Sequence, residues 1–406
     1  MERNDVLIAW QAVKQAGGSG GHDGQTIEFI GNDYKNHLYK IWNRLTSGSY
    51  MAQPVKLVAI PKAKGGLRIL GIPTVTDRIA QMAIKNRLEP VLEPHFHSDS
   101  YAYRANKSAI DAVGVTRERC FKSKWVIDMD IKGFFDALDH DLLLEMVEKY
   151  TDDEMILLYV KRFLKAKGIT PEGEEVERDQ GTPQGGVISP LLANLYLHEV
   201  FDSWISASHS HVQFERYADD IIVHCVSEKQ AKYMLDKIAQ RMAKYNLELH
   251  PDKTRIVYVG KDGRGDGVIR SVPRKFIFLG YDFKPRSWRG KNVFSPGIGL
   301  SAKKMIRDKM KLWRLRHKLH DLTLEEIAKL VNPVIRGWIQ YYGHYRRSEL
   351  YAVVEDINAE LVRWLKKKYK KIRNYNQAWG RLHEYKSRSP TLFCHWHMVK
   401  SPTRAV

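Results

Sequence analysis

Two adjacent acidic residues, Asp219 and Asp220, follow Tyr217-Ala218 and lie between the apolar runs 212–214 and 221–223. This spacing predicts a strand, a turn and a second strand, with both carboxylates at the tip of the hairpin. Adjacent carboxylates repel each other there, and a divalent cation such as Mg²⁺ removes that cost by binding their oxygens together with substrate phosphate oxygens. Because strand side chains alternate between faces, both carboxylates reach one site only if they lie on the turn. A solvated Asp-Asp turn is the structural alternative.

A third carboxylate, Asp130, ends a stretch at 126–131 with the pattern of a buried strand. An unpaired carboxylate is costly in such a place, so we expect Asp130 to lie beside the hairpin pair. Three carboxylates could hold two metal ions, one lowering the pKa of an attacking hydroxyl and one stabilising a leaving pyrophosphate, which suits in-line nucleotidyl transfer. Asp128, on the same strand face, and Asp136, beyond Gly133 and able to cap a helix, are the alternatives.

The elements that must position these carboxylates alternate between helix and strand up to about residue 300. Two strands at 55–60 and 67–72 are predicted to form a hairpin through a turn at 62–66, and Asp77 is the predicted N-cap of a helix at 78–88. The other predicted elements are helices at 5–15, 191–201 and 229–245, a helix beginning near Asp139, and strands at 125–131, 214–225, 253–259 and 276–283. From Ser301 onward the pattern is helical to the end, so we expect an α+β first part and an all-α last part.

The charge of the chain indicates a polyanionic partner. The net charge is +19 over 406 residues, and the isoelectric point is near 9.6. Residues 301–406 hold 24 Lys and Arg against 9 Asp and Glu, so most of the excess lies in the last quarter. This distribution predicts a phosphate-binding surface in the helical part, and nucleic acid is its expected partner.

Several function classes are excluded by composition. No apolar stretch approaches the roughly 18 residues needed to span a bilayer, and residues 1–5 lack the pattern of a secretory signal. Three separated cysteines favour neither a disulfide framework nor a zinc site, so a reducing, cytosolic setting is expected. Asp139-His140-Asp141 is interpreted as a helix start, and Cys394-His395 with His397 lacks a partner cluster at zinc spacing.

Taken in order, the motifs of this chain resemble those of bacterial group II intron-encoded reverse transcriptases and maturases, from about residue 8 to residue 396. The segments that carry the resemblance are Ile60-Pro61-Lys62, residues 70–75 with Asp77-Arg78, residues 130–136, residues 180–186 with 189–194, Tyr217-Ala218-Asp219-Asp220, residues 249–254 and Phe278-Leu279-Gly280-Tyr281. Three C-terminal segments, 333–342, 361–370 and 393–396, resemble the thumb and maturase region. The chain ends soon after Trp396, so the resemblance is to members that lack a zinc-binding endonuclease.

The resemblance implies a right-hand polymerase fold with fingers, palm and thumb. Fingers would span 1–122, the palm 123–300 and a basic thumb and maturase region 301–406. The palm range includes a fingers-derived segment at about 140–190 and a primer-grip hairpin at about 274–284.

The same resemblance implies roles for single residues. Metal ions, two Mg²⁺ with Mn²⁺ as an alternative, would be held by Asp130, Asp219, Asp220 and the backbone of Ile131. Lys253 would protonate the leaving pyrophosphate. The dNTP contacts it implies are Lys62 and Arg68 at the triphosphate, Ile131, Phe135 as the gate against a 2′-hydroxyl, and Gln184 over the incoming nucleotide.

The function expected from the resemblance is RNA-directed DNA synthesis together with binding of an intron RNA to assist its splicing and retrohoming. An RNA template, intron RNA, a DNA primer or target and dNTPs would be the partners, in a cytoplasmic, nucleoid- or ribonucleoprotein-associated setting. Two alternatives stay open: a related reverse transcriptase used by its host in defence or repair, and a catalytically idle RNA-binding splicing factor. The aromatic residues of the helical region, such as Trp338, Tyr342 and Trp364, could stack on unpaired bases or form the packing core of the helices.

Overall fold

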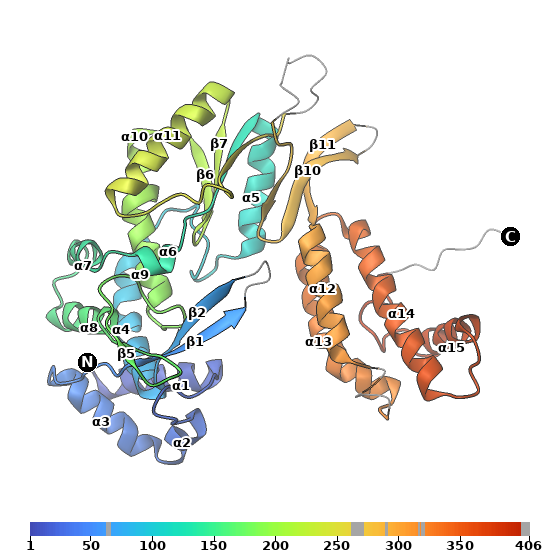
Figure 1. Cartoon of the computed structure of the whole chain (residues 1–406), viewed down its shortest axis with the longest axis horizontal. Helices are drawn as coiled ribbons and strands as arrows, with labels where there is room; N and C mark the ends of the chain where they lie inside the picture. The colour runs from blue at the N-terminus through green and yellow to red at the C-terminus, as the bar shows by residue number, and fades with distance from the viewer. Residues whose placement is uncertain (62–65, 261–271, 289–290, 316, 318–320, 399–406) are drawn as a thin grey trace. The chain divides into compact units, whose positions relative to one another are not determined.

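The computed structural model describes residues 1–61, 66–260, 272–288, 291–315, 317 and 321–398 (Figure 1). The chain divides into two compact units. The first combines Met1–Ala112 with Trp125–Ile256, and the second combines Val113–Lys124 with Val257–Val406. Each unit therefore contains segments that are far apart in the sequence.

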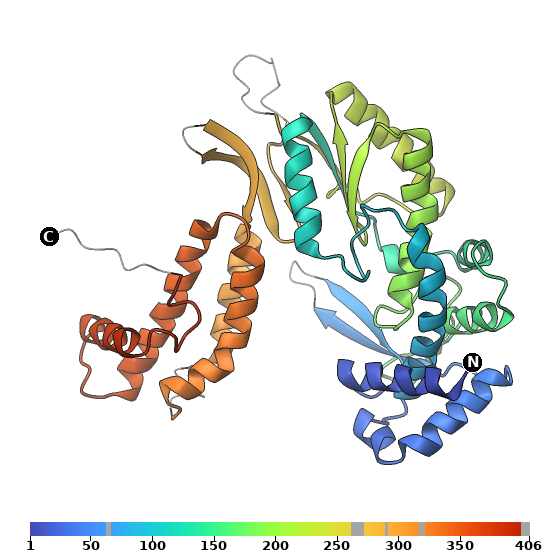
Figure 2. The same ribbon diagram turned by 180° about the vertical axis from the view of Figure 1, so that it is seen from behind.

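The first unit begins with a helical layer. Its helices are α1 (Arg3–Ala16), α2 (Ile27–Asn32), α3 (Tyr34–Thr46) and α4 (Val75–Leu92). α1 packs along α4 with an apolar face at helical spacing (Figure 2) and ends at Gly17, whose φ of 72° suits glycine. The predicted N-cap of α4 is wrong: Thr74 caps the helix, and its hydroxyl accepts from the backbone N–H of Asp77 at 3.0 Å.

Asp77 has a different structural role. Its buried carboxylate accepts hydrogen bonds from the Thr74 and Tyr50 hydroxyls at 2.9 and 2.8 Å and from the Gln53 backbone N–H at 3.1 Å. Burial raises the pKa of Asp77 to about 6, against the lowering effect of these hydrogen bonds. The side chain therefore joins the start of α4 to the segment that follows α3.

The predicted hairpin of the first unit is confirmed as β1 (Val55–Pro61) and β2 (Leu67–Ile72), although residues 62–65 of its turn lie outside the described residues. β1 also pairs with β4 (Gly168–Ile169), which pairs with β5 (Glu175–Val176), so the strand order is β2-β1-β4-β5. Gly71 in β2 donates its backbone N–H to the carbonyl of Gln184 at 3.0 Å. A Cβ at Gly71 would lie 2.9 Å from Pro183, so the close approach requires glycine.

A four-stranded sheet with the order β6-β7-β3-β8 carries the candidate site. Its strands are β3 (Trp125–Met129), β6 (Gln213–Tyr217), β7 (Asp220–Cys225) and β8 (Arg255–Tyr258), and all four confirm predicted strands. The predicted helix after β7 is confirmed as α11 (Glu228–Lys244), which packs against β3 and β7 (Figure 1). The residues of β7 after Asp220 are all buried, and they form the core of the sheet together with one face of α11.

Five helices connect these strands within the described residues, and two of them, α7 and α9, were predicted. They are α6 (Phe134–Ala137), α7 (His140–Glu148), α8 (Glu154–Leu164), α9 (Ser189–Leu197) and α10 (Ser203–Ser208). Asp139 is the N-cap of α7 and accepts from two backbone N–H groups at 3.0 Å, which confirms it as a helix start. The helix predicted at 191–201 is α only to Leu197 and continues as a π-helix over His198–Asp202.

The second unit contains a three-stranded sheet and a helical region. The sheet has the order β11-β10-β9, with β9 (Phe276–Phe278), β10 (Tyr281–Trp288) and β11 (Lys291–Ile298). The helices are α12 (Leu300–Trp313), α13 (Leu324–Tyr342), α14 (Tyr351–Lys368) and α15 (Tyr375–Arg388), which confirms the prediction of helix from Ser301 onward. The C-terminal half of α5 (Ala109–Lys122), which begins in the first unit, also belongs here.

The segment after α15 closes the helical region. The side-chain oxygen of Asn358 in α14 lies within hydrogen-bond distance of His395 Nε2 at 2.9 Å and of Trp396 Nε1 at 3.1 Å, and all three side chains are buried. Asn332 in α13 accepts from the backbone N–H of Cys394 at 3.1 Å. These contacts give Cys394 and His395 structural roles within the helical region.

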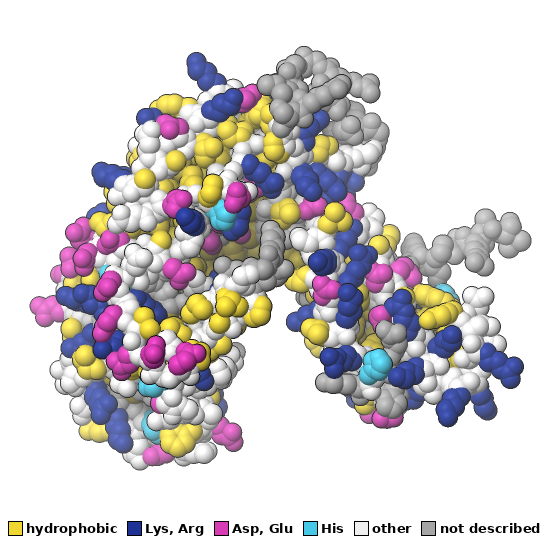
Figure 3. All heavy atoms as spheres, in the orientation of Figure 1, with side chains coloured by type: hydrophobic (Ala, Val, Ile, Leu, Met, Phe, Trp, Pro, Cys, Tyr) yellow, Lys and Arg dark blue, Asp and Glu magenta, His cyan; other side chains and the backbone are white. Residues whose placement is uncertain are grey.

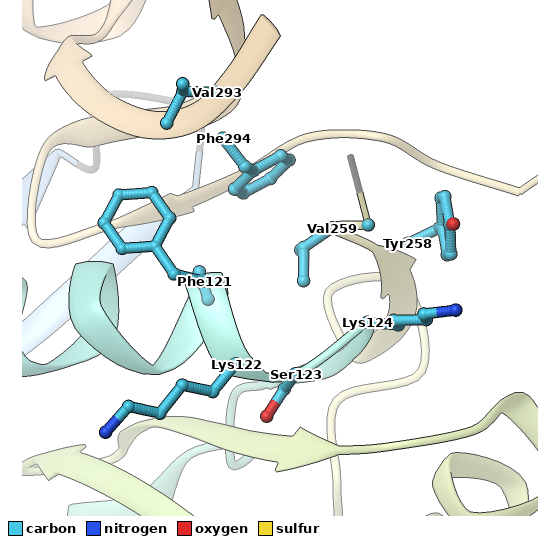
Figure 4. Close-up of a pocket in the computed structure, with 10 residues that line it drawn as sticks. Phe121, Lys122, Ser123, Lys124, Tyr258, Val259, Val293 and Phe294 are labelled. Atoms are coloured by element: carbon cyan, nitrogen blue, oxygen red, sulfur yellow. The ribbon is translucent and has the colours of Figure 1, made fainter. Parts of the chain in front are cut away.

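A cavity of about 360 Å³ lies within the second unit (Figure 4). Phe121 of α5 and Val259 lie on opposite sides of it in this view, and the ring of Phe294 of β11 lies above the space between them. The ten described residues that line it include Lys122 and Lys124 but no Asp or Glu, so this cavity offers no carboxylate ligand to a divalent cation.

Candidate active site

The three predicted metal-binding carboxylates converge at one end of the β6-β7-β3-β8 sheet. Asp220 begins β7, Asp219 lies on the turn before it, and Asp130 follows the last residue of β3. β3 and β7 are antiparallel with Met129 opposite Ile221, and continuing that register by one residue sets Asp130 opposite Asp220. Residues that face each other in such a ladder lie about 5 Å apart between Cα atoms, so the three side chains share one end of the sheet.

The hairpin that carries the adjacent carboxylates is unusually tight. Tyr217 pairs with Asp220, which leaves only Ala218 and Asp219 to form the turn. Ala218 has a φ of 56°, a conformation that costs about 1 kcal/mol or more for a residue with a side chain. The sequence-based condition that both carboxylates lie on the turn is met by Asp219 only, because Asp220 is the first residue of β7.

The carboxylates strongly influence one another. Burial, followed by the charges of Asp219, Asp130 and Asp128, raises the pKa of Asp220 to about 7, although its side chain keeps an exposed surface. Burial and the Asp130 charge also raise the pKa of Asp219, whereas the positive charges of Arg68 and Lys253 lower it. A site that concentrates negative charge in this way favours a cation between the carboxylates.

Lys253 is brought to the site as predicted. Its Nζ lies 3.0 Å from both oxygens of Asp130. The loop that carries it is fixed by a hydrogen bond of 2.8 Å from the His250 backbone N–H to the Asp130 carbonyl. The ammonium group therefore already lies beside one of the carboxylates.

Neither alternative for the third carboxylate replaces Asp130. Asp128 is paired with Arg255, whose Nε and Nη2 both lie 3.0 Å from Asp128 Oδ2. Burial raises the pKa of Asp128 to about 6, and the guanidinium of Arg255 opposes that shift. Asp136 is the third residue of α6 rather than its cap, and it accepts hydrogen bonds from the Gln184 amide at 3.3 Å.

Two of the predicted nucleotide-binding residues contact each other. Arg68 of β2 donates from Nε to Gln184 Oε1 at 2.5 Å. Arg68 also lies close enough to Asp219 to influence its pKa. Lys62, which was predicted to contact the triphosphate together with Arg68, lies outside the described residues, so its role stays a prediction.

The predicted sugar gate, Phe135, lies half-buried on α6. Its ring makes an edge contact with Phe134 at 5.4 Å between centroids, and its carbonyl accepts from the Thr182 N–H at 2.8 Å. Ile131 is buried and forms a backbone bridge with Leu249. Both residues follow Asp130 closely, so the predicted metal-binding and sugar-gate positions lie within one short segment after β3.

Sequence reasoning missed two features of the site. Tyr103 is half-exposed with a φ of 58°, and its pKa is raised by burial and by the charge of Asp219. Arg216 is fully buried below the turn and pairs with Asp202 of the π-helix at 2.6 Å. An arginine in a strand otherwise rich in buried residues was the available signal for this ion pair, since a buried charge requires a partner.

The donor set fits a divalent cation. Among the described residues, no group of three or more His, Cys, Asp or Glu side chains is close enough to hold a metal as it stands. However, the donors are carboxylate oxygens with raised pKa values, and Asp130 already has a cationic partner in Lys253. Hard cations such as Mg²⁺ prefer such ligands and need only a few of them when phosphates supply the rest.

Basic side chains gather over the helices of the second unit. Figure 3 shows Lys and Arg spread over the surface of α12–α15. Trp364 and Tyr342 are buried, so they belong to the packing core, whereas Trp338 is half-exposed and stacks on Trp313 at 5.8 Å between ring centroids. Some of these aromatic residues therefore pack the helices together, whereas others are partly exposed at the surface.

Comparison with known families decides the identity of the fold. A family model described as reverse transcriptase (RNA-dependent DNA polymerase) matches residues 60–283, which is more than half of the chain. The chain belongs to the reverse transcriptase family. A second model, the maturase-specific domain of group II introns, matches residues 303–384. These matches confirm the predicted resemblance, the polymerase fold and the all-helical maturase region of this reverse transcriptase.

Relatives of this reverse transcriptase include intron-encoded proteins. Protein YkfC of Escherichia coli is 33% identical over 279 residues, which cover 59% of this chain and 69% of YkfC. The group II intron-encoded protein LtrA of Lactococcus lactis is 29% identical over 329 residues, 78% of this chain and 53% of LtrA. Telomerase from Candida albicans aligns over 91% of this chain and 67% of that chain with 13% identity and a TM-score of 0.45.

Membership fixes the general chemistry of this reverse transcriptase. The family synthesises DNA from an RNA template and uses divalent metal ions, and its partners are nucleic acids. No helix within the described ranges is both long and apolar enough to cross a bilayer.

Proposed function

We propose that this reverse transcriptase extends a DNA primer on an RNA template by two-metal nucleotidyl transfer and also binds its intron RNA to assist splicing and retrohoming. The observation that carries the proposal is the convergence of Asp130, Asp219 and Asp220, where burial and the neighbouring carboxylates raise the pKa of Asp219 and of Asp220. Two Mg²⁺ ions, bound by these carboxylates and the backbone carbonyl of Ile131, would activate the primer 3′-hydroxyl and stabilise the leaving pyrophosphate.

The surrounding residues receive roles from their positions. Lys253, which lies 3.0 Å from Asp130, would donate a proton to the leaving pyrophosphate. Arg68 would bind the triphosphate of the incoming dNTP, and Gln184 would lie over its sugar and base. The Phe135 ring would exclude a 2′-hydroxyl because it fills that space and offers the hydroxyl no hydrogen-bond partner.

We also propose that different regions of the chain carry polymerisation and RNA binding. Fingers at 1–122 and a palm at 123–300 would carry polymerisation, and the basic helices at 301–406 would bind RNA. Phosphate contacts alone give salt-sensitive, unspecific affinity, so recognition of one intron would depend on RNA shape as well. Intron RNA, a DNA primer or target and dNTPs are the expected partners, and a cytoplasmic ribonucleoprotein is the expected setting.

An idle RNA-binding splicing factor is the alternative from another class of function. It is disfavoured because RNA binding requires none of the three carboxylates, and holding them together without a cation raises the energy of the fold. A host-adapted polymerase would use the same chemistry. Intron sequence on both sides of the reading frame would favour the intron-encoded protein, and its absence would favour the host-adapted one.

The proposal is tested with the variant Asp219→Ala. Purified protein is given an RNA template annealed to a DNA primer, all four dNTPs and MgCl₂, and primer extension is measured beside RNA affinity at fixed salt. We expect extension to be lost and RNA affinity to stay within about twofold, because the side chain binds metal and not RNA. Asp236→Ala, an exposed substitution on α11, is the matched control and should extend normally. Extension by Asp219→Ala at the wild-type rate would refute the site assignment.

A further inference from the structure

Asp136 is an exposed acidic residue on α6, next to the predicted sugar gate, and the metal site leaves it without a role. Both of its oxygens lie 3.3 Å from Gln184 Nε2. On the other side of that amide, Gln184 Oε1 accepts from Arg68 Nε. We propose that Asp136 is a positioning residue that sets the direction of the Gln184 amide and thereby holds Arg68 ready for the triphosphate.

The chemistry of the three groups allows only one arrangement. A carboxylate accepts hydrogen bonds and a guanidinium donates them, whereas a primary amide does both at opposite ends. Between Asp136 and Arg68, the Gln184 amide must therefore turn its NH₂ toward Asp136 and its oxygen toward Arg68. The reversed amide would set NH₂ against a guanidinium and oxygen against a carboxylate, which leaves both contacts repulsive.

The backbone beneath Gln184 is already fixed, so its side chain is the part that remains to be oriented. The 181–184 loop is joined to α6 by hydrogen bonds from Thr182 N–H to the Phe135 carbonyl at 2.8 Å and from Gly181 N–H to the Leu138 carbonyl at 2.7 Å. Its other end is joined to β2 through the Gly71 N–H at 3.0 Å from the Gln184 carbonyl. Such a frame fixes the backbone and leaves the side-chain torsions, the amide torsion among them, as the remaining freedom of Gln184.

A second cation faces Asp136. Arg178, which follows β5, is half-buried, and its pKa is lowered by burial and raised by the charge of Asp136. Its Nη1 is buried and has no hydrogen-bond partner among the described residues. Asp136 thus lies between an amide donor and a guanidinium, and both neighbours favour an acceptor at this position.

The inference rests on the proposed function, in which Gln184 and Arg68 meet the incoming dNTP. If Asp136 sets the amide direction, its loss weakens nucleotide binding while the chemical step keeps its carboxylates. The expected signature is therefore a higher KM for dNTP with kcat nearly unchanged.

The test is a double-mutant cycle of Asp136→Ala and Gln184→Ala, measured by steady-state single-nucleotide extension with MgCl₂. We expect Asp136→Ala to raise KM for dNTP about tenfold, the ratio for loss of one hydrogen bond to a charged group. Asp136→Asn should raise it about threefold, because its own amide oxygen still accepts from Gln184. In the Gln184→Ala background, Asp136→Ala should change KM by less than twofold, since the group it orients is absent.

Asp152→Asn, an exposed acidic residue before α8, is the matched control and should leave KM and kcat at wild-type values. A KM within twofold of wild type for Asp136→Ala would overturn the inference. A tenfold effect that persists in the Gln184→Ala background would also overturn it, because the two residues would then act independently. Failure of the wild-type protein to extend any primer would instead count against the proposed function itself.

Discussion

The buried ion pair beneath the catalytic turn gives the sharpest test of how this site is held. Arg216 of β6 has no exposed surface, and its Nε and Nη2 donate to Asp202 at 2.8 and 2.6 Å. Its Nη1 donates to Asn194 of α9 at 3.0 Å and also lies 3.4 Å from the Ala218 carbonyl on the turn. One side chain therefore connects the turn to two helices.

The substitution Arg216→Met keeps most of the side-chain volume and removes every donor. Asp202 then keeps its charge in a place with no exposed surface. Leaving one partner of a buried pair alone costs about 3–5 kcal/mol, because the desolvated charge loses its compensation. Replacing both partners, with Asp202→Leu added, removes the charge as well, and the double variant should recover at least half of that loss.

Hydrogen exchange of the backbone amides in β6 and β7 is the suitable measurement, because it reports the local opening free energy of this hairpin within a chain of two units. We expect exchange in the single variant to be faster by about two orders of magnitude, which corresponds to about 3 kcal/mol. Exchange in the double variant should lie between the single variant and wild type. A double variant as unstable as the sum of the two single variants would refute the idea that Arg216 and Asp202 stabilise the turn as a pair.

Phe135→Ala should raise incorporation of ribonucleotides relative to dNTPs at least tenfold, measured by single-nucleotide extension, because the ring no longer fills the space of the 2′-hydroxyl; unchanged sugar selectivity would remove it from that role. Gly185→Ala should lower kcat/KM about 100-fold, as expected for a misplacement near 1 Å, because a Cβ there would lie 2.5 Å from the Gly71 carbonyl oxygen. Gly173→Ala, also at positive φ but with nothing within 4 Å, should keep full activity. Burial lowers the pKa of His395 to about 3 in the folded chain. Protonation of this ring therefore favours the unfolded chain. The stability that depends on the neutral ring is complete above about pH 6.5, the pKa of an unfolded histidine, and is lost as the pH falls. Between pH 7 and 4, the free energy of unfolding of His395→Gln should therefore fall less than that of the wild-type protein, by up to about 1.4 kcal/mol per pH unit in chemical denaturation. Parallel plots of unfolding free energy against pH for the two proteins would contradict this.

The strands of the β6-β7-β3-β8 sheet and the carboxylates at its end were predictable because their signals are local, whereas β4, β5 and β11 were not predicted. Asp219 and Asp220 lie between two apolar runs, and these runs are sufficient to predict the hairpin around them. The same holds for β1, β2 and the helices after Ser301, whose periodicity extends over many residues. Family motifs then connected distant segments that no periodicity could bring together.

The N-cap of α4 could not be assigned with the same certainty. Thr74, Thr76 and Asp77 are all suitable N-cap residues within four positions. The choice depends on tertiary partners, because the Asp77 carboxylate is held by Tyr50 and by the Gln53 backbone, far away in the sequence. The residues at the start of the helix do not by themselves reveal those contacts.

The contacts of Asp136 and Arg216 were hidden for a related reason. Asp136 was one of several acidic residues near a strand end, and its link to Gln184 crosses 48 residues. Asp202 meets Arg216 from a π-helix, an irregularity that hydrophobic periodicity does not reveal. Long-range polar pairs of this kind require the fold before they can be recognised.

The hydrogen bond between Gly71 and the Gln184 carbonyl has a mechanical consequence. It joins the C-terminal end of β2 to a loop more than a hundred residues later, and the absence of a side chain at both Gly71 and Gly185 lets the two backbones come into contact. A displacement of the β1–β2 hairpin would therefore carry Gln184 with it. Arg68 on the hairpin and Gln184 on the loop would therefore move together when a nucleotide binds, and would not respond independently. A stiffer β1–β2 hairpin should slow the movement of both residues toward the nucleotide and away from it.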